Sequence, residues 1–293
     1  SIIQKLPIPQ PHQAKPIKEL LKNKLTKKEF LYLFSSYDIV GSIAIIDIPK
    51  GLGKKKKLIA NELLNSSKIL KTVAIKSGAT QGKYRIRKIT PIAGIKTTKT
   101  ISSESGCKFK IDINKAYYTN RFASDRLEIA SQLTQNENVL ALFSGICPYP
   151  IVIEKNAKNL PKKIIAIELN PQAHKLAIEN ISINKCSKIE AIHADAKKEL
   201  KKKKYKDWEN RILMPHPTQA MHFLGDAINA AKSGAIIHFY TFAPPENPKA
   251  PYSGAIVQAK AQNASLKLLH AKIVRPFSKE KSQVRLDLKV IKG

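Results

Sequence analysis

The chain has 293 residues and a formal net charge of +30, from 52 Lys and Arg against 22 Asp and Glu. This excess is larger than solubility requires, so it predicts a polyanionic partner, most simply a nucleic acid. No apolar run approaches the roughly 18 residues that span a bilayer, which argues against a membrane protein, and no signal peptide is visible.

The plainer alternative for the charge is a proteome rich in lysine. In surface ion-pair networks, however, acidic residues rise together with lysine, and here they do not. The three cysteines, Cys107, Cys147 and Cys186, form neither a metal-ligand spacing nor a disulfide framework. They indicate a reduced, cytoplasmic protein that needs no metal.

The first part of the chain reads as an arm followed by a small basic module. Residues 1–34 predict a Pro- and Gln-rich arm and helical segments. Residues 35–115 predict an α+β module, because short alternating strands surround one lysine-rich helix. The expected strands cover residues 37–49, 71–76, 83–94 and 107–113, and the expected helix covers 52–67.

From residue 116 to residue 293 the pattern changes to regular strand and helix alternation. Such alternation predicts an α/β fold with a mostly parallel sheet and helices on both faces, which binds ligands beyond the carboxyl ends of its strands. Residues 264–277 and 282–291 predict a final antiparallel pair. The other expected strands are 138–145, 163–170, 188–195, 211–214 and 234–243, and the expected helices are 125–134, 148–157, 171–185, 197–204 and 218–232.

Three residues at the ends of successive strands suggest a ligand. Gly145 lets backbone pass close to a cofactor, Glu168 can accept both hydroxyls of a ribose, and Asp195 can accept from an adenine amino group. Taken singly, each residue has a simpler explanation: a glycine in a turn, an acidic residue in a loop or a helix cap. Because no G-x-G-x-x-G cradle for a pyrophosphate is present, the pattern favours an adenosine ligand without phosphates, and S-adenosylmethionine is the obvious one.

The segment RILMPHPTQA, residues 211–220, ends a strand with Pro215, His216 and Pro217. Proline fixes φ and removes a backbone donor, so this strand tip is predicted to be rigid and poor in donors. The alternative is that the prolines only mark the start of the next helix, with Pro217 near its first position.

Several segments together resemble the archaeal and eukaryotic tRNA (guanine-N1) methyltransferases, which modify the guanosine immediately 3′ of the anticodon. These segments keep the family's order and spacing from about residue 35 onward. The first proline of Pro-His-Pro, where most members have Asn-Leu-Pro, resembles the archaeal subgroup that also methylates 4-demethylwyosine at C7 to isowyosine. The segments are SSYDIVGSIAIIDIP, KYRIRKITPIAG, AYYTNRFASDRLEIA, VLALFSGICPYPIVI, IAIELNPQA and RILMPHP.

The resemblance implies a class I methyltransferase sheet, S-adenosylmethionine as the cofactor, and the anticodon stem-loop of tRNA as the partner of a monomeric enzyme. It assigns catalytic roles to Asp125, as general base, and to Arg85, which steadies charge on the guanine oxygen. Substrate contacts fall on Tyr117, Arg121, Pro215 and Pro217. Cofactor contacts fall on Arg126, Phe143, Gly145, Glu168, Leu169, Asp195, Ala196 and Pro215.

Three departures from the family pattern stand out. Asp125 replaces the family's Glu, Cys147 replaces the second glycine of the loop after the first strand, and the family's N-terminal domain for the tRNA elbow is expected to be reduced. From the residues alone, Asp125 is also a candidate N-cap of its helix, and Arg85 a solvated strand residue. The alternatives to methyl transfer are transfer of the aminocarboxypropyl group in wybutosine biosynthesis and a non-catalytic RNA-binding module.

Overall fold

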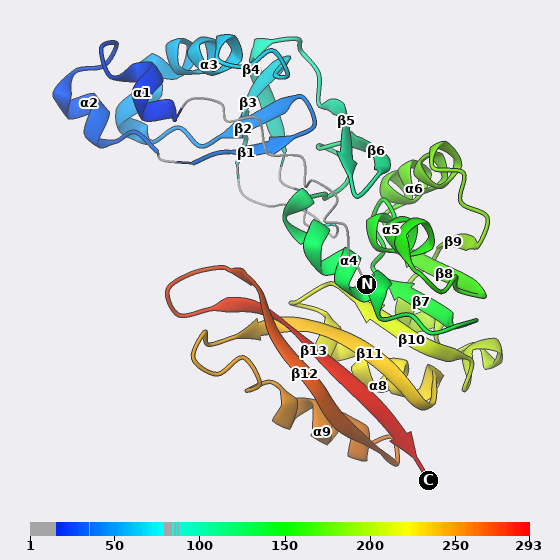
Figure 1. Cartoon of the computed structure of the whole chain (residues 1–293). Coiled ribbons are helices and arrows are strands. Elements are labelled where there is room, and N and C mark those ends of the chain that lie inside the picture. Colours follow the sequence, from blue (N-terminus) through cyan, green and yellow to red (C-terminus); the bar gives the residue numbers. More distant parts are fainter. Residues whose placement is uncertain (1–15, 35, 79–83, 85, 87) are drawn as a thin grey trace, which may run out of the picture. The chain divides into compact units, whose positions relative to one another are not determined.

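The computed structural model describes residues 16–34, 36–78, 84, 86 and 88–293, which form two compact units (Figure 1). The first unit comprises the described residues up to 102 together with 112–114, and the second comprises 103–111 and 115–293. The division runs through the hairpin of β5 (Lys99–Glu104) and β6 (Cys107–Asp112), with the chain changing unit after residues 102, 111 and 114.

The first unit is a four-stranded sheet with helices packed against it. Its strands lie in the order β1 (Asp38–Val40), β2 (Ile43–Ile46), β3 (Thr72–Lys76) and β4 (Ile89–Gly94), and only β2 and β3 are parallel. A crossover joins that pair, as a parallel connection requires. The crossover consists of η1 (Lys50–Lys55) and α3 (Lys56–Asn65).

The segment before residue 35 belongs to the core of this first unit. It forms α1 (Ile17–Leu21) and α2 (Lys27–Leu31), not one helix, because Thr26 and Glu29 make a reciprocal capping box that begins a new helix. Ile17 and Leu21 pack into the same apolar cluster as Ile59 and Leu63 of α3.

The second unit carries a seven-stranded sheet in the order β12-β13-β11-β10-β7-β8-β9. Five strands run parallel, and β13 lies antiparallel between β11 and β12, as the sequence predicts. The strand order reverses between β7 and β10, which makes the carboxyl ends of these strands the expected ligand site. The strands are β7 (Asn138–Leu142), β8 (Lys163–Glu168), β9 (Ile189–His193), β10 (Glu209–Met214), β11 (Ala231–Ala243), β12 (Ala264–Pro276) and β13 (Ser282–Lys292).

Helices cover both faces of this sheet (Figure 1). One apolar cluster joins α8 (Ala220–Ala230) and α9 (Tyr252–Lys260) to the sheet, and the other joins α4 (Ala123–Ser131) and α5 (Pro148–Asn156) to it. Alternate residues of β13 divide between these faces, since Val284, Leu286 and Leu288 are apolar, whereas Arg285 and Asp287 point the other way. The remaining helices are α6 (Pro171–Ile183), α7 (Ala196–Glu199) and the short η2 (Asn120–Phe122) and η3 (Lys203–Tyr205).

Some boundaries differ from those expected. The helix predicted over 197–204 is only α7 and η3, because the buried Leu200 and Tyr205 lie on different turns with exposed lysines between them. Helix α9 was not predicted, since its sequence YSGAIVQAK contains a glycine and follows a proline-rich loop. Only Ile89–Gly94 of the strand expected over 83–94 is a described strand.

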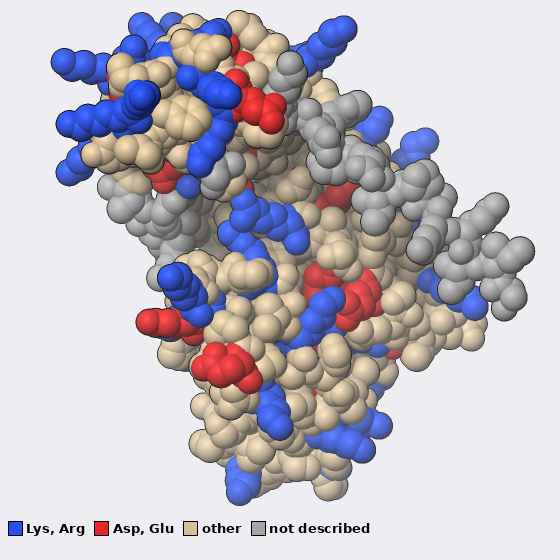
Figure 2. All heavy atoms as spheres, turned by 60° about the vertical axis from the view of Figure 1, so that its left-hand side comes forward, with Lys and Arg blue, Asp and Glu red and all other residues tan. Residues whose placement is uncertain are grey.

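The charged surface of the described chain is dominated by basic side chains. Figure 2 shows lysine and arginine spread over the visible face of both units, with acidic residues confined to a few patches. Among the described residues, no helix combines the length and the hydropathy that crossing a bilayer demands.

Glu209, the first residue of β10, is fully buried, and neither carboxylate oxygen has a hydrogen-bond partner among the described residues. Burial raises the pKa of this carboxyl to about 8. The folded state therefore holds a proton that the unfolded chain, with an ordinary pKa near 4.5, releases. The contribution of Glu209 to stability is fully present below pH 4.5 and is lost as the pH rises toward 8.

We expect Glu209→Gln to raise the free energy of unfolding at pH 8 by on the order of 4 kcal/mol, because the amide cannot ionise and each unit of pKa shift corresponds to about 1.4 kcal/mol. At pH 5 the difference should fall to about 1 kcal/mol. Denaturant unfolding at both pH values measures this, with Glu190→Gln as the control, since Glu190 pairs with Lys163 on the surface. An equal effect at both pH values would contradict the assignment.

Candidate active site

The carboxyl ends of four neighbouring strands lie at one level. Leu142 pairs with Ile167, Glu168 pairs with His193, and Leu213 pairs with Ala141. The next residues along these strands bring Phe143, Glu168, His193 and Pro215 to the same edge of the sheet. Seven of the predicted cofactor residues therefore meet there, namely Phe143, Gly145, Glu168, Leu169, Asp195, Ala196 and Pro215.

The loop after β7 is tightly folded by three left-handed residues, Phe143 (φ 53°), Gly145 (φ 56°) and Cys147 (φ 64°). A Cβ added at Gly145 would meet only the Tyr117 carbonyl oxygen, at 3.9 Å, so open space lies beside this backbone. Cys147 adopts a conformation that favours glycine, which explains the residue it replaces in the resembling family. Burial raises the pKa of its thiol to about 12, so it stays protonated.

Glu168 organises the loops around it through two backbone hydrogen bonds. Its Oε2 accepts from the Gly145 N–H at 2.7 Å, and its Oε1 accepts from the Asn170 N–H at 2.7 Å. Burial raises the pKa of this carboxyl, although the backbone donors oppose the shift. The carboxylate keeps further lone pairs, which are available to hydroxyl donors such as those of a ribose.

The neighbouring strand end supplies a second set of polar groups. Asp195 caps α7, with its Oδ1 accepting from the Lys197 N–H at 2.9 Å, and Ala196 is buried below it. A ring nitrogen of His193 lies 3.1 Å from the Leu169 carbonyl oxygen and holds the loop that follows Glu168. Open backbone at Gly145, an acidic acceptor at Glu168 and a second at Asp195 fit an adenosine group without phosphates.

The Pro-His-Pro turn closes this edge at the end of β10. The His216 N–H donates to the Met214 carbonyl at 2.9 Å, and the His216 carbonyl accepts from the Ala220 N–H at 2.9 Å. Helix α8 begins at Ala220, three residues after Pro217. The His216 ring packs edge-on against Phe143, and Phe143 packs edge-on against Phe223, which makes this wall of the site aromatic.

Asp125 lies in the first turn of α4 and is only 1% exposed. Its Oδ2 accepts hydrogen bonds from the hydroxyls of Tyr149, at 2.8 Å, and Tyr240, and its Oδ1 accepts from Arg285 Nη1 at 2.5 Å. Phe122, not Asp125, is the N-cap of α4, so the capping alternative is wrong. Since Phe239 pairs with Met214, Tyr240 brings this cluster to the level of Pro215.

Arg285 links the Asp125 carboxylate to a larger set of buried charges. It also donates to Glu128 at 2.5 Å and to Asp287 at 2.8 Å, and Asp287 accepts from His238 at 2.6 Å. Burial lowers the pKa of His238, whereas its bond to Asp287 opposes that shift. Despite burial, the pKa of Asp287 falls to about 2, because His238 and Arg285 both donate to it. Through Arg285, this cluster of buried charges therefore fixes the position of the Asp125 side chain.

The other predicted residues lie in different surroundings. Arg126 is buried, and its Nη1 donates to both Glu104 oxygens at 2.6 Å while its guanidinium faces the Tyr118 and Tyr149 rings. In the described structure this arginine also donates to the Thr119 carbonyl at 3.0 Å and so supports the segment before α4. Tyr117 is 64% exposed and Arg121 is exposed in η2. Arg85 lies outside the described residues.

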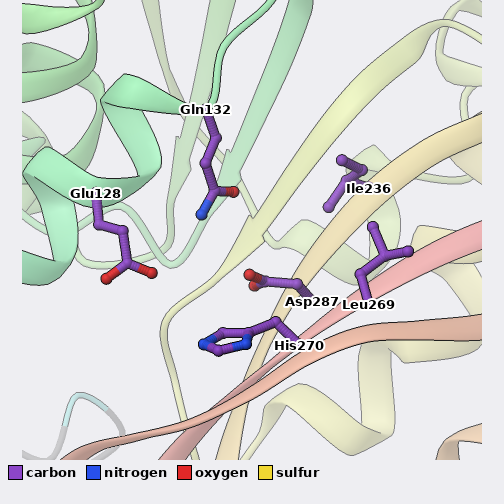
Figure 3. Close-up of a pocket in the computed structure, with 6 residues that line it drawn as sticks. All are labelled: Glu128, Gln132, Ile236, Leu269, His270 and Asp287. Atoms are coloured by element: carbon purple, nitrogen blue, oxygen red, sulfur yellow. The ribbon is translucent and has the colours of Figure 1, made fainter.

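A cavity of about 400 Å³ lies between α4 and the sheet, lined by Glu128, Gln132, Ile236, Leu269, His270 and Asp287 (Figure 3). Its carboxylates are already paired, Glu128 with Lys272 and Arg285, and Asp287 with Arg285. Ile236 pairs with Lys289, and Asp287 pairs with His238. Both positions lie before the carboxyl edge of the sheet, level with Arg211 and Leu213 of β10, so this cavity is not the cofactor site.

Sequence reasoning did not identify Tyr149, Tyr240 or Arg285 as partners of Asp125. Tyr149 is one of several apolar residues of α5, and Tyr240 sits in an apolar strand, so neither stands out. The one available signal was the strand RLDL, residues 285–288, where two charges alternate with leucines that must be buried.

Comparisons with known proteins agree with this geometry. The family described as TRM5/TYW2 methyltransferase domain matches residues 100–267, and the TYW2 N-terminal domain matches residues 17–98. The chain is 31% identical to the tRNA (guanine(37)-N(1))-methyltransferase Trm5b of Pyrococcus abyssi, over 88% of this chain and 76% of that protein.

Two further relatives carry different activities in their names. The chain is 29% identical to the tRNA (guanine(37)-N(1))/4-demethylwyosine(37)-methyltransferase Taw22 of Nanoarchaeum equitans, over 87% of this chain and 100% of that protein. It is 31% identical to the tRNA(Phe) (4-demethylwyosine(37)-C(7)) aminocarboxypropyltransferase of Methanocaldococcus jannaschii, over 70% of this chain and 77% of that protein.

Solved structures match as well. The crystal structure of Pyrococcus abyssi Trm5b has a TM-score of 0.81 at 29% identity and covers 91% of this chain and 78% of that one. A complex of aTrm5 with tRNALeu has a TM-score of 0.79 at 28% identity, over 94% of this chain and 78% of that one. Because the family match spans more than half of the sequence, the chain belongs to the TRM5/TYW2 family and is an S-adenosylmethionine-dependent tRNA methyltransferase.

Proposed function

We propose that this enzyme methylates the guanosine 3′ of the anticodon at N1 and also methylates 4-demethylwyosine at C7. The observation that supports both substrates is the rigid Pro215 turn, which lies level with Glu168 and Phe143 at the cofactor edge. The docked part of the tRNA is its anticodon stem-loop, where an unpaired base can be turned out at little cost.

In the proposed reaction the cofactor supplies an electrophilic methyl group. Guanine N1 becomes nucleophilic only when its proton leaves, and a carboxylate at the base edge can take that proton. We assign this role to Asp125 and assign to Arg85 the stabilisation of charge on the guanine oxygen. The N1–C bond forms as the C–S bond breaks, and the proton remains on the carboxylate until product release.

The burial of Asp125 sets a condition on this assignment. The base edge has to replace the Tyr149 or Tyr240 hydroxyl on Oδ2, and the number of hydrogen bonds to the carboxylate is then unchanged. Arg285 stays on Oδ1 throughout and holds the negative charge in position. Tyr117 and Arg121 are assigned to the target base and the loop backbone, because both are exposed just before α4.

We expect Pro215→Asn to shift activity toward guanosine. An asparagine amide can donate hydrogen bonds to a guanine edge and accept them from it. Proline provides only van der Waals contact and its carbonyl oxygen, which suits the less polar tricyclic base of 4-demethylwyosine. The ratio of kcat/KM for guanosine-bearing tRNA to that for 4-demethylwyosine-bearing tRNA should rise about tenfold, the equivalent of roughly one hydrogen bond. An unchanged ratio for Pro215→Asn would leave the first proline without a role in selectivity.

A second candidate function is transfer of the aminocarboxypropyl group. It is supported by the match of residues 17–98 to the TYW2 N-terminal domain and by the identity with the Methanocaldococcus jannaschii transferase. The cofactor is the same in both cases, and the two reactions differ in which carbon leaves the sulfur. The predicted cofactor residues Gly145 and Glu168 are compatible with either reaction. Only the identity of the transferred group therefore distinguishes the two functions.

A further inference from the structure

The hairpin between β12 and β13 extends past the active-site edge of the sheet. Ala243 of β11 pairs with Ser282, and Ser282 also pairs with Pro276, so all three lie at one level. That level is four residues beyond Phe239, which pairs with Met214 at the end of β10. At about 3.3 Å per residue, the hairpin projects roughly 13 Å beyond Met214, or about 10 Å beyond the level of Pro215.

Two phenylalanines form a ring pair on this projection. Phe242 and Phe277 have centroids 4.9 Å apart with an interplanar angle of 57°. Phe242 is two residues beyond Tyr240 on the same strand, so both point to the face that holds Asp125. The pair therefore lies about 7 Å along the strand from the Asp125 cluster, on the same side of the sheet.

Phe277 is well fixed and yet 65% exposed. Its N–H donates to the Lys281 carbonyl at 3.0 Å, the Ser278 N–H donates to the same carbonyl at 2.8 Å, and the Lys281 N–H donates to Ser278 Oγ at 3.1 Å. A single exposed apolar residue is common on protein surfaces. An aromatic ring that is carried on a hydrogen-bonded turn, packed against a second ring and placed beside a reaction site is better suited to contact a ligand.

The charges around the pair indicate the chemistry of that ligand. Arg275, Lys279 and Lys281 flank Phe277, against one acidic residue, Glu280. Lys272 on the same strand is held by Glu128, so it does not add to this charge. An aromatic face within a basic border is the usual arrangement for binding an unpaired nucleotide, with the base on the ring and the phosphates near the cations.

We propose that Phe242 and Phe277 form a stacking platform for an unpaired base next to the target nucleotide in the RNA loop. The inference rests on the proposed function for its choice of RNA loop. When the target base is turned into the site, its neighbour loses a stacking partner inside the loop, and the platform replaces that partner. Phe242 lies two residues, about 7 Å, beyond Tyr240 on β11, and this spacing suits two adjacent nucleotides.

The test is direct binding of an anticodon stem-loop RNA to the full chain, measured by fluorescence anisotropy. Phe277→Ala should raise the Kd about tenfold, because removing one base–aromatic stack costs on the order of 1–3 kcal/mol. Phe277→Tyr should restore binding to within about twofold. The Kd for S-adenosylmethionine and the kcat at saturating RNA should stay unchanged within the same factor. Val257→Ala is the control, since Val257 is also 65% exposed but lies on α9.

A set of RNAs that each carry one abasic loop nucleotide identifies the stacked base. When the abasic position is the stacked nucleotide beside the target, no base is left to stack on Phe277. Wild type and Phe277→Ala should then bind that RNA equally. The proposal is overturned if Phe277→Ala binds the intact RNA as tightly as the wild type, or if its defect is the same with every abasic RNA. Binding is measured without methyl transfer, so a wild type that bound RNA but formed no product would refute the proposed function and leave this test valid.

Discussion

Replacing Asp125 with asparagine is expected to lower the rate of methyl transfer by about 10²- to 10⁴-fold, the range that a positioned general base contributes. The amide keeps the shape of the side chain and can still accept from one tyrosine, but it cannot take the N1 proton. The Kd for S-adenosylmethionine should stay within about threefold, because the described hydrogen-bond partners of Asp125 are Tyr149, Tyr240 and Arg285, none of which is assigned to the cofactor. Single-turnover kinetics with unmodified tRNA and calorimetry with the cofactor measure the two quantities.

The same substitution also removes a charge from a buried ion pair, and breaking such a pair costs about 3–5 kcal/mol of stability. Activity therefore has to be measured well below the melting temperature of the variant. Glu128→Gln is the matched control, because it too removes an acidic partner of Arg285 but leaves Asp125 in place. Normal turnover by Asp125→Asn, or an equal loss of activity in Glu128→Gln, would rule out Asp125 as the base.

The second large effect is expected for Glu168→Gln, which should weaken cofactor binding by about 10- to 100-fold. The carboxylate accepts from the N–H groups of Gly145 and Asn170, and charge-assisted bonds of this kind contribute about 1.5–3 kcal/mol each. In the variant, the amide nitrogen faces one of those N–H groups and cannot accept from it. Isothermal titration with S-adenosylmethionine measures the change.

Glu190→Gln serves as the control for that experiment, because Glu190 lies on the neighbouring β9 and pairs with the surface residue Lys163. Binding of the RNA should be the same for both variants and the wild type. If Glu168→Gln bound the cofactor as tightly as the control, the role of Glu168 would be limited to holding the loop backbone, without a contribution to cofactor binding.

The sequence predicted the fold of the second unit because its signals are local. Each buried strand is a short apolar run that ends at a small or acidic residue, and parallel strands bring their carboxyl ends to one edge. For this reason Gly145, Glu168, Asp195 and Pro215, which lie up to 70 residues apart, could be placed together before any coordinates were known. The match to the family residues was equally local, since it rested on continuous segments.

The surroundings of Asp125 could not be predicted in the same way. Its partners Tyr149, Tyr240 and Arg285 come from a helix and two strands that are 24, 115 and 160 residues away. Which alternate residues of β11 and β13 face α4 depends on the strand register, and a shift of one residue reverses it. Helix α9 was missed because propensity favours no element strongly there, and packing against β12 decides the outcome.

The measurement that tests the central claim most directly uses cofactor labelled in two positions. The full chain is incubated with unmodified tRNA and with tRNA that carries 4-demethylwyosine, using S-adenosylmethionine labelled in either the methyl or the carboxyl group, and the nucleosides are then analysed by mass spectrometry. The account predicts that methyl label enters both RNAs, at N1 of guanosine and at C7 of the tricycle, each with a net gain of one CH₂. Carboxyl label in the nucleoside, with no methyl label, would contradict it.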